Sequence, residues 1–189
     1  MSKAIGLVEY KTISSGMTAT DILVKTADVN IMQAGTVCPG KFYALIEGEI
    51  SAVQASINAA KKALPEKLID DFVLGNPDKS LFNAIWGTTS VGKPNAIGIL
   101  ETYSIAQAIV AADVAVKAAE VILVELRLAR GMCGKSYFLV TGEVAAVTMA
   151  IDKAKKSAGE NGMYLDSSVI AGPDIKAWEK LVMYIICYR

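Results

Sequence analysis

Ala4-Ile5-Gly6-Leu7-Val8-Glu9 returns almost unchanged later in the chain as Ala96-Ile97-Gly98-Ile99-Leu100-Glu101. The copy continues in the same register: Asp21 and Lys25 recur as Asp113 and Lys117, and Val29 recurs as Val121. A repeat that occupies about half of a 189-residue chain indicates one small domain written twice. We therefore expect two domains, at residues 1–90 and 91–189, with residues 88–94 as the linker.

The later blocks of the repeat carry an additional shift of two residues. Two pairs of blocks show it: Gly40-Lys41 recurs as Gly134-Lys135, and Gly48-Glu49 recurs as Gly142-Glu143. The insertion falls within residues 35–39 or their counterpart 127–133, and a length change inside a regular copy marks a loop. In the first copy this loop holds Cys38. Its counterpart in the second copy is Met132, and the counterpart of Pro39 is Cys133.

The chain has more apolar residues than a typical soluble domain. Apolar residues other than glycine make up 53% of the chain, whereas a typical soluble domain reaches about 45–50% with glycine included. Because two small domains can each bury only a modest core, the excess indicates surface that is reserved for burial against other copies.

The charged residues exclude several functions. Lys+Arg and Asp+Glu balance at 19 each, so no nucleic-acid footprint is present, and the absence of histidine excludes histidine catalysis and histidine metal sites. The chain has no glycine-rich phosphate loop, no Gly-x-Ser-x-Gly elbow and no paired metal motif, so we do not expect an enzyme. Glu9 and Glu101 occupy equivalent places in the repeat and are expected to make structural hydrogen bonds.

Neither a membrane span nor a disulfide framework is expected. The most apolar stretch, residues 104–126, contains four charges, and the start of the chain lacks the pattern of a secretory signal. The three cysteines, at positions 38, 133 and 187, have no short spacing, which favours a reducing cytosol. Cys187 lies in an apolar tail at residues 182–188, where packing or disorder is expected.

Hydrophobic periodicity predicts the same elements in both copies. The first copy is expected to have strands at residues 4–10, 29–37, 42–46 and 72–74 and helices at 14–27 and 50–63, with Ser14 as an N-cap and Pro65 as a helix end. The second copy is expected to have strands at residues 96–102, 121–128, 137–141 and 168–170 and helices at 105–119 and 144–157. The order β-α-β-β-α-β predicts an α+β domain, a ferredoxin-like variant with helices packed on a mostly antiparallel sheet.

These blocks together resemble the bacterial microcompartment shell domain. The shared features are Ala-Ile-Gly-x-x-Glu, a helix with Asp-x-x-x-Lys-x-Ala-x-Val, a Gly-Lys turn, and Gly-Glu-[Ile/Val]-x-Ala-Val at the start of the second helix. Two such domains in direct order resemble the tandem-domain, trimer-forming shell proteins. More narrowly, Thr36-Val37-Cys38-Pro39-Gly40-Lys41-Phe42 resembles the iron–sulfur shell proteins of propanediol-utilisation microcompartments.

The resemblance implies a pseudo-hexameric homotrimer in a microcompartment shell within the cytoplasm. Other shell proteins and lumenal redox enzymes are the expected partners, with no nucleic acid and no membrane among them. The resemblance also places Lys25 and Lys117 at the assembly edge. On helical geometry alone, each lysine is a solvated partner of the aspartate four residues earlier.

The resemblance further implies that Cys38 from three chains holds one 4Fe-4S cluster per trimer at the three-fold pore, for electron transfer or cluster exchange across the shell. The expected pore-loop residues are Thr36, Val37, Pro39, Gly40, Met132, Cys133 and Gly134. Pro39 and Gly40 favour a tight turn at a crowded axis. Two alternatives stay open: a purely structural tile whose pore passes a small metabolite and in which Cys38 is a free thiol, and a soluble redox carrier unrelated to shells. Cys133 is expected to line the pore or to be packed.

Overall fold

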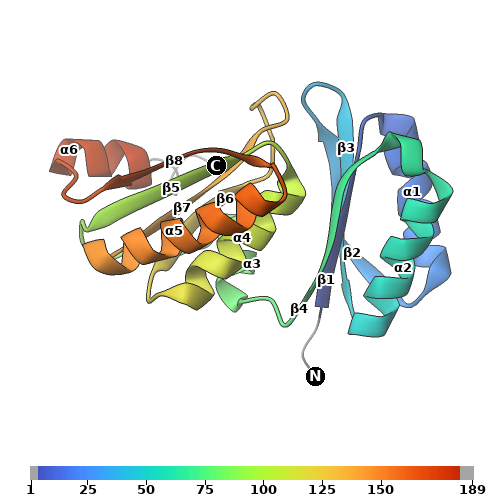
Figure 1. Cartoon of the computed structure of the whole chain (residues 1–189), viewed down its shortest axis with the longest axis horizontal. Helices are drawn as coiled ribbons and strands as arrows, with labels where there is room; N and C mark the ends of the chain where they lie inside the picture. Colours follow the sequence, from blue (N-terminus) through green and yellow to red (C-terminus); the bar gives the residue numbers. More distant parts are fainter. Residues whose placement is uncertain (1–3, 184–189) are drawn as a thin grey trace. The chain divides into compact units, whose positions relative to one another are not determined.

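The computed structural model describes residues 4–183, and its internal contacts divide the chain into two compact units (Figure 1). Within this range, unit 1 comprises residues 4–77 together with Ser104–Ala106 and Ala129–Gly134, and unit 2 comprises the remainder. The two short segments from the second copy therefore belong, by their contacts, to the first unit. The apolar tail with Cys187 lies outside the described residues.

Unit 1 contains a four-stranded antiparallel sheet in the order β2-β3-β1-β4. Its strands are β1 (Ala4–Tyr10), β2 (Val29–Val37), β3 (Lys41–Gly48) and β4 (Leu68–Gly75). Helices α1 (Ile13–Thr26) and α2 (Ile50–Ala63) cover one face of this sheet (Figure 1), and a short 3-10 turn, η1 (Pro65–Lys67), follows α2.

Unit 2 repeats this plan with a sheet in the order β6-β7-β5-β8. Its strands are β5 (Ala96–Thr102), β6 (Ile122–Arg127), β7 (Ser136–Gly142) and β8 (Tyr164–Ile170). Its helices are α3 (Lys79–Trp86), α4 (Ile105–Ala118), α5 (Val144–Glu160) and α6 (Ile175–Trp178), and a π-helical turn, η2 (Glu179–Met183), follows α6. The first two residues of α4 group with unit 1.

The repeated glycine in the first block explains how helix and sheet meet. Every residue of β1 is buried, as expected for a central strand. A methyl group added at Gly6 would lie 2.6 Å from the Val53 side chain of α2, and one added at Gly98 would lie 2.7 Å from Val147 of α5. Both copies therefore use a glycine to bring the second helix close to the central strand.

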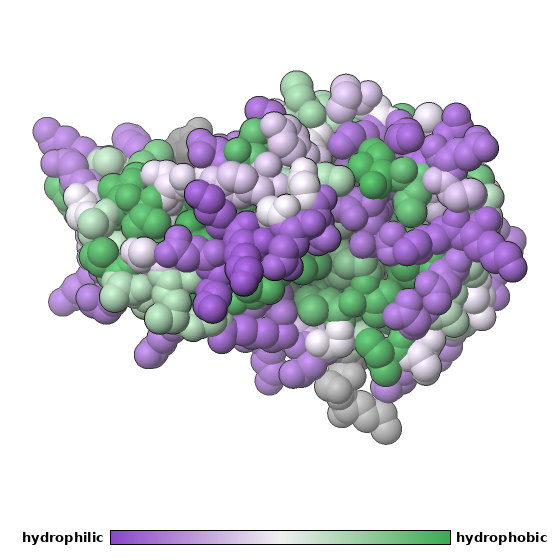
Figure 2. All heavy atoms as spheres, in the orientation of Figure 1, coloured by the Kyte–Doolittle hydropathy of each residue, from purple (hydrophilic) through white to green (hydrophobic). Residues whose placement is uncertain are grey.

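The exposed apolar surface agrees with the excess seen in the composition. Figure 2 shows hydrophobic side chains interspersed with charged ones over the visible face. The exposed large hydrophobic residues include Ile13, Met17, Val24, Ile31, Ile50, Ile122 and Met149. No helix within residues 4–183 is long and apolar enough to cross a membrane.

Three details of the structure differ from the sequence-based prediction. The N-cap of α1 is Thr12, not Ser14, because the Thr12 hydroxyl accepts the Ser15 N–H at 3.4 Å. Helices α3 and α6 were not predicted, and each begins directly after an aspartate that caps it. The last strand of each copy is longer than predicted, since β4 begins at Leu68 and β8 at Tyr164.

Candidate functional site: the Cys38 turn and the helix starts

Cys38 lies in the hairpin turn between β2 and β3. Val37 pairs with Lys41 at the end of the ladder, and the Gly40 N–H donates to the Val37 carbonyl at 2.9 Å. Gly40 has φ +94°, which glycine adopts at little steric cost. The Cys38 side chain is a free thiol and is exposed.

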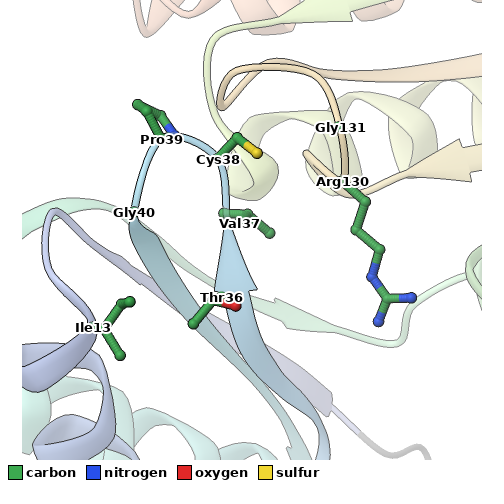
Figure 3. Close-up of a pocket in the computed structure, with 8 residues that line it drawn as sticks. All are labelled: Ile13, Thr36, Val37, Cys38, Pro39, Gly40, Arg130 and Gly131. Atoms are coloured by element: carbon green, nitrogen blue, oxygen red, sulfur yellow. The ribbon is translucent and has the colours of Figure 1, made fainter.

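A shallow, open depression of about 400 Å³ lies beside this turn in unit 1 (Figure 3). It is lined by Ile13, Thr36, Val37, Cys38, Pro39, Gly40, Arg130 and Gly131. Figure 3 shows Cys38 and Pro39 together at the tip of the turn, with Ile13 near the start of α1 below it. The start of α1 and the Cys38 turn therefore form one continuous face.

The counterpart loop of the second copy lies against the Cys38 turn. A methyl group added at Gly134 would lie 2.9 Å from Lys41 Nζ and 3.1 Å from the Cys38 carbonyl oxygen. Cys133 is an exposed free thiol with φ +51°, and Met132 is half-buried. Of the predicted pore-loop residues, the structure thus brings Gly134 next to Cys38.

Within the part of the chain that the structure describes, one chain does not bring together a complete ligand set for a metal cluster. Among residues 4–183, no three His, Cys, Asp or Glu side chains gather where they could hold a metal ion. An exposed thiol at the tip of a turn can instead be contributed to a ligand set shared between chains. A 4Fe-4S cluster consequently fits these residues only as a group that several copies hold together.

Glu9 connects the base of the Cys38 turn to the start of α4. Its side chain is fully buried, and Glu9 Oε1 lies 3.2 Å from Lys41 Nζ. Glu9 Oε2 accepts the Ile105 N–H at 2.9 Å, which confirms the predicted structural hydrogen bonds for Glu9. Burial raises the pKa of Glu9, while the Lys41 ammonium and the Ile105 N–H partly oppose that rise.

Asp70 stands beside Glu9 on the neighbouring strand and holds the residue before Ile105. The two acids are paired in the β1–β4 register. Asp70 Oδ2 accepts the Ser104 hydroxyl at 2.5 Å, and its pKa is also raised, chiefly by burial. Sequence reasoning missed Asp70, because a carboxylate that caps a distant helix leaves no local pattern.

Lys25 and Lys117 make the predicted i,i+4 ion pairs, but in different surroundings. Both ammonium groups lie 2.6 Å from the partner aspartate. The Asp21 side chain is 58% exposed, whereas that of Asp113 is 5% exposed and also accepts the Asp78 backbone N–H at 2.8 Å. The lysine of the second copy is therefore paired with a more buried aspartate.

The comparisons with known proteins agree with this architecture. A family model described as the BMC domain matches residues 4–77 and 96–173. The chain is 43% identical to the bacterial microcompartment shell protein PduT from Citrobacter freundii over 182 residues, which span 96% of this chain and 99% of that protein.

Two solved structures share the fold. A microcompartment protein from Desulfitobacterium hafniense DCB is 41% identical, with a TM-score of 0.82 over 92% of this chain and 97% of its own. The fused permuted hexameric shell protein of the RMM microcompartment is 23% identical, with a TM-score of 0.65 over 84% of each chain, a likeness of fold alone.

Proposed function

Because the chain belongs to the BMC-domain family of bacterial microcompartment shell proteins, we propose that three copies bind one 4Fe-4S cluster through Cys38. The family and the α+β tandem fold that the sequence predicts are confirmed. Membership places the protein in the shell of a microcompartment within the bacterial cytoplasm. The domain boundary near residue 90 stays a prediction.

The observation that carries the cluster proposal is the exposure of Cys38 at the tip of a turn that the second copy does not reproduce. The counterpart position holds Met132, so only one of the two loops in each chain offers a thiol at that place. A homotrimer would then contribute three Cys38 thiolates to one axis, and a cluster with four irons would have one left for another ligand.

The chain's own residues would hold and orient the thiol. Gly40 and the Val37–Lys41 pair fix the turn, and Gly134 packs beside the Cys38 carbonyl. When bound, the cluster would supply one-electron transfer. Lys41, which is anchored by buried Glu9, lies at the base of the turn and contributes positive charge close to this site.

The proposed partners follow from the shell role. Other shell proteins would meet the tile at the edge that carries Lys25 and Lys117, and lumenal redox enzymes would exchange electrons or clusters at the pore. The curated relative that spans the chain is named as a shell protein, which supports a role other than catalysis.

The test is iron and acid-labile sulfide analysis of the anaerobically purified protein, with paramagnetic resonance of the reduced sample. We expect about four irons and four sulfides per three chains. Cys38→Ser should lose both while the oligomer persists, and Cys133→Ser, the matched control at the other exposed thiol, should keep both.

Two results would contradict the proposal. If wild-type protein holds no iron after reconstitution, Cys38 is a free thiol in a structural tile with a metabolite pore. If Cys38→Ser retains its full iron content, any cluster is bound elsewhere.

A further inference from the structure

We propose that Cys38 and Cys133 of one chain form a reversible disulfide when a peroxide oxidises the cluster-free protein. The disulfide removes Cys38 from the ligand set and protects it from irreversible oxidation. This inference rests on the cluster proposed above, because it concerns the state of the same thiol when no cluster is bound. Both cysteines belong to unit 1.

The backbones of the two cysteine-bearing turns meet at Gly134. A methyl group added at Gly134 would lie 3.1 Å from the Cys38 carbonyl oxygen. Cys133 directly precedes Gly134, and the Cα atoms of neighbouring residues are about 3.8 Å apart. Bond geometry then limits the distance between the Cα atoms of Cys38 and Cys133 to about 11 Å or less.

The two turns can close the remaining distance. A disulfide joins Cα atoms that are about 4.4–6.8 Å apart, so an approach of about 4 Å is enough even from the upper limit. A methyl group added at Gly40 in the first turn, or at Gly131 in the second, would meet nothing within 4 Å, which leaves both turns space to move. Figure 3 shows the Cys38 side chain pointing toward the loop that carries Arg130 and Gly131.

Both thiols are open to solvent. Cys38 and Cys133 are exposed, and each is a free cysteine. A small oxidant can therefore reach either sulfur, whereas cysteines that are packed in a core are inert. An exposed cysteine beside a second thiol is the arrangement of redox-sensing sites, in which the second thiol resolves the oxidised one.

The reaction balances with two thiols and one molecule of hydrogen peroxide. The Cys38 thiolate attacks one peroxide oxygen, the O–O bond breaks, and a hydroxide leaves as Cys38 becomes a sulfenic acid. The Cys133 thiolate then attacks the Cys38 sulfur, the S–S bond forms, and the sulfenic oxygen leaves as a second hydroxide. The two thiol protons convert these hydroxides to water. The sulfur atoms together lose two electrons, which reduce the peroxide.

The cluster and the disulfide exclude each other, because both need the Cys38 sulfur and iron is bound by the thiolate. A sulfenic acid that finds no second thiol is oxidised further to a sulfinic acid, which a reducing thiol does not restore. A disulfide, by contrast, is opened by a reducing thiol, and Cys38 then returns to the ligand set. Cys133 thereby keeps the cluster site recoverable after oxidation.

The first experiment treats the full-length protein with hydrogen peroxide after a chelator has removed any iron. Peptide mass spectrometry without reduction should find one peptide pair linked through Cys38 and Cys133. The linked chain should be lighter by about 2 Da, the mass of the two thiol hydrogens. Cys187→Ser, which removes the third cysteine of the chain, should give the same linked pair.

The second experiment measures how much iron the peroxide-treated protein binds on reconstitution with iron and sulfide. The wild type should bind none until dithiothreitol opens the disulfide, and should then recover its full iron content. Cys133→Ser should bind as much iron as the wild type before peroxide treatment. After peroxide and dithiothreitol it should have lost most of that capacity, because its Cys38 sulfenic acid is not resolved.

Three results would overturn the disulfide: no linked peptide, covalent dimers of chains joined through Cys38, or full recovery of iron binding by peroxide-treated Cys133→Ser. The cluster proposal is tested separately by the same samples. A linked peptide in a protein that never binds iron would leave the disulfide standing and contradict only the cluster. Iron binding without a linked peptide would contradict only the disulfide.

Discussion

Glu9 is a carboxylate whose burial and partners act against each other. Lys41 from β3 and the Ile105 N–H at the start of α4 favour the ionised form, whereas burial and Asp70 from β4 oppose it. Burial is the largest of these effects, so the pKa of Glu9 rises above its ordinary 4.5. The folded protein therefore holds this proton more readily than the unfolded chain does.

This imbalance predicts how Glu9 affects stability as pH changes. A raised folded-state pKa means that the contribution of Glu9 to stability is greatest below 4.5 and declines as pH rises through the folded-state value. Compared with Glu9→Gln, the wild type should gain free energy of unfolding as pH falls from neutral toward 4.5. Urea unfolding of both proteins at a series of pH values measures this difference. Asp70, whose pKa is also raised, is present in both proteins and so contributes to both curves. A difference that does not change with pH would contradict the assignment.

At the scale of elements, α3 depends on a cap that lies shortly after β4. Asp78 accepts both the Ser80 N–H, at 2.8 Å, and the Ser80 hydroxyl, at 2.6 Å. The Ser80 side-chain hydrogen bond is the main reason that the pKa of Asp78 is lowered from 3.8. The cap therefore stabilises α3 above that pH, and its contribution is lost as pH falls through the folded-state pKa.

Removal of the Asp78 side chain should weaken α3 selectively. Asp78→Ala is expected to lower the free energy of unfolding by about 1 kcal/mol at neutral pH, the usual cost of losing such a cap. Asp78→Asn, which keeps a capping oxygen, is the matched control and should lose little. Chemical denaturation measures both, and equal stability of the wild type and Asp78→Ala would show that the cap is not needed.

The elements that were predicted correctly have local signals. The stripe Val53, Ile57 and Ala60 identifies α2, and Pro65 marks where it ends. Helix α3 was not predicted, because it is only eight residues long and its cap, Asp78, directly follows Pro77, a sequence that is also typical of a turn. Both Thr12 and Ser14 suit an N-cap, and only the hydrogen-bond geometry decides between them.

The candidate site was predictable to the extent that the two copies differ in sequence. Cys38 attracts attention because its counterpart is Met132. The links from Glu9 to Ile105 and from Asp70 to Ser104 were not predictable, because they join residues far apart in the chain. A carboxylate that accepts a hydrogen bond from a distant helix start has no fixed sequence spacing to its partner, so no sequence pattern reveals it.

At the scale of the whole molecule, Lys25 and Lys117, which we propose lie at the assembly edge, should not respond alike to substitution. Lys25→Glu is expected to weaken sheet formation with other tiles and to leave the trimer intact, because Lys25 and Asp21 are both largely exposed. Lys117→Glu should weaken sheets and also lower stability, since Asp113 is nearly buried and binds the Asp78 N–H. Electron microscopy of assembled sheets, together with sedimentation, distinguishes the two effects.

Lys62→Glu is the control for this pair, because Lys62 is an exposed lysine on α2. It should form sheets as the wild type does. Normal sheets from the variant with both Lys25 and Lys117 reversed would show that these residues do not lie at the edge.

The near-identity of β1 and β5 has a consequence for synthesis. Each strand is central in its sheet and would fit the place of the other, so an unfolded chain has two competing partners for every neighbouring strand. β1 finds both of its neighbours, β3 and β4, before residue 76. Because domains tend to fold in order as they leave the ribosome, we expect the first sheet to form before Ala96 emerges, so that vectorial translation would keep the two copies from exchanging strands.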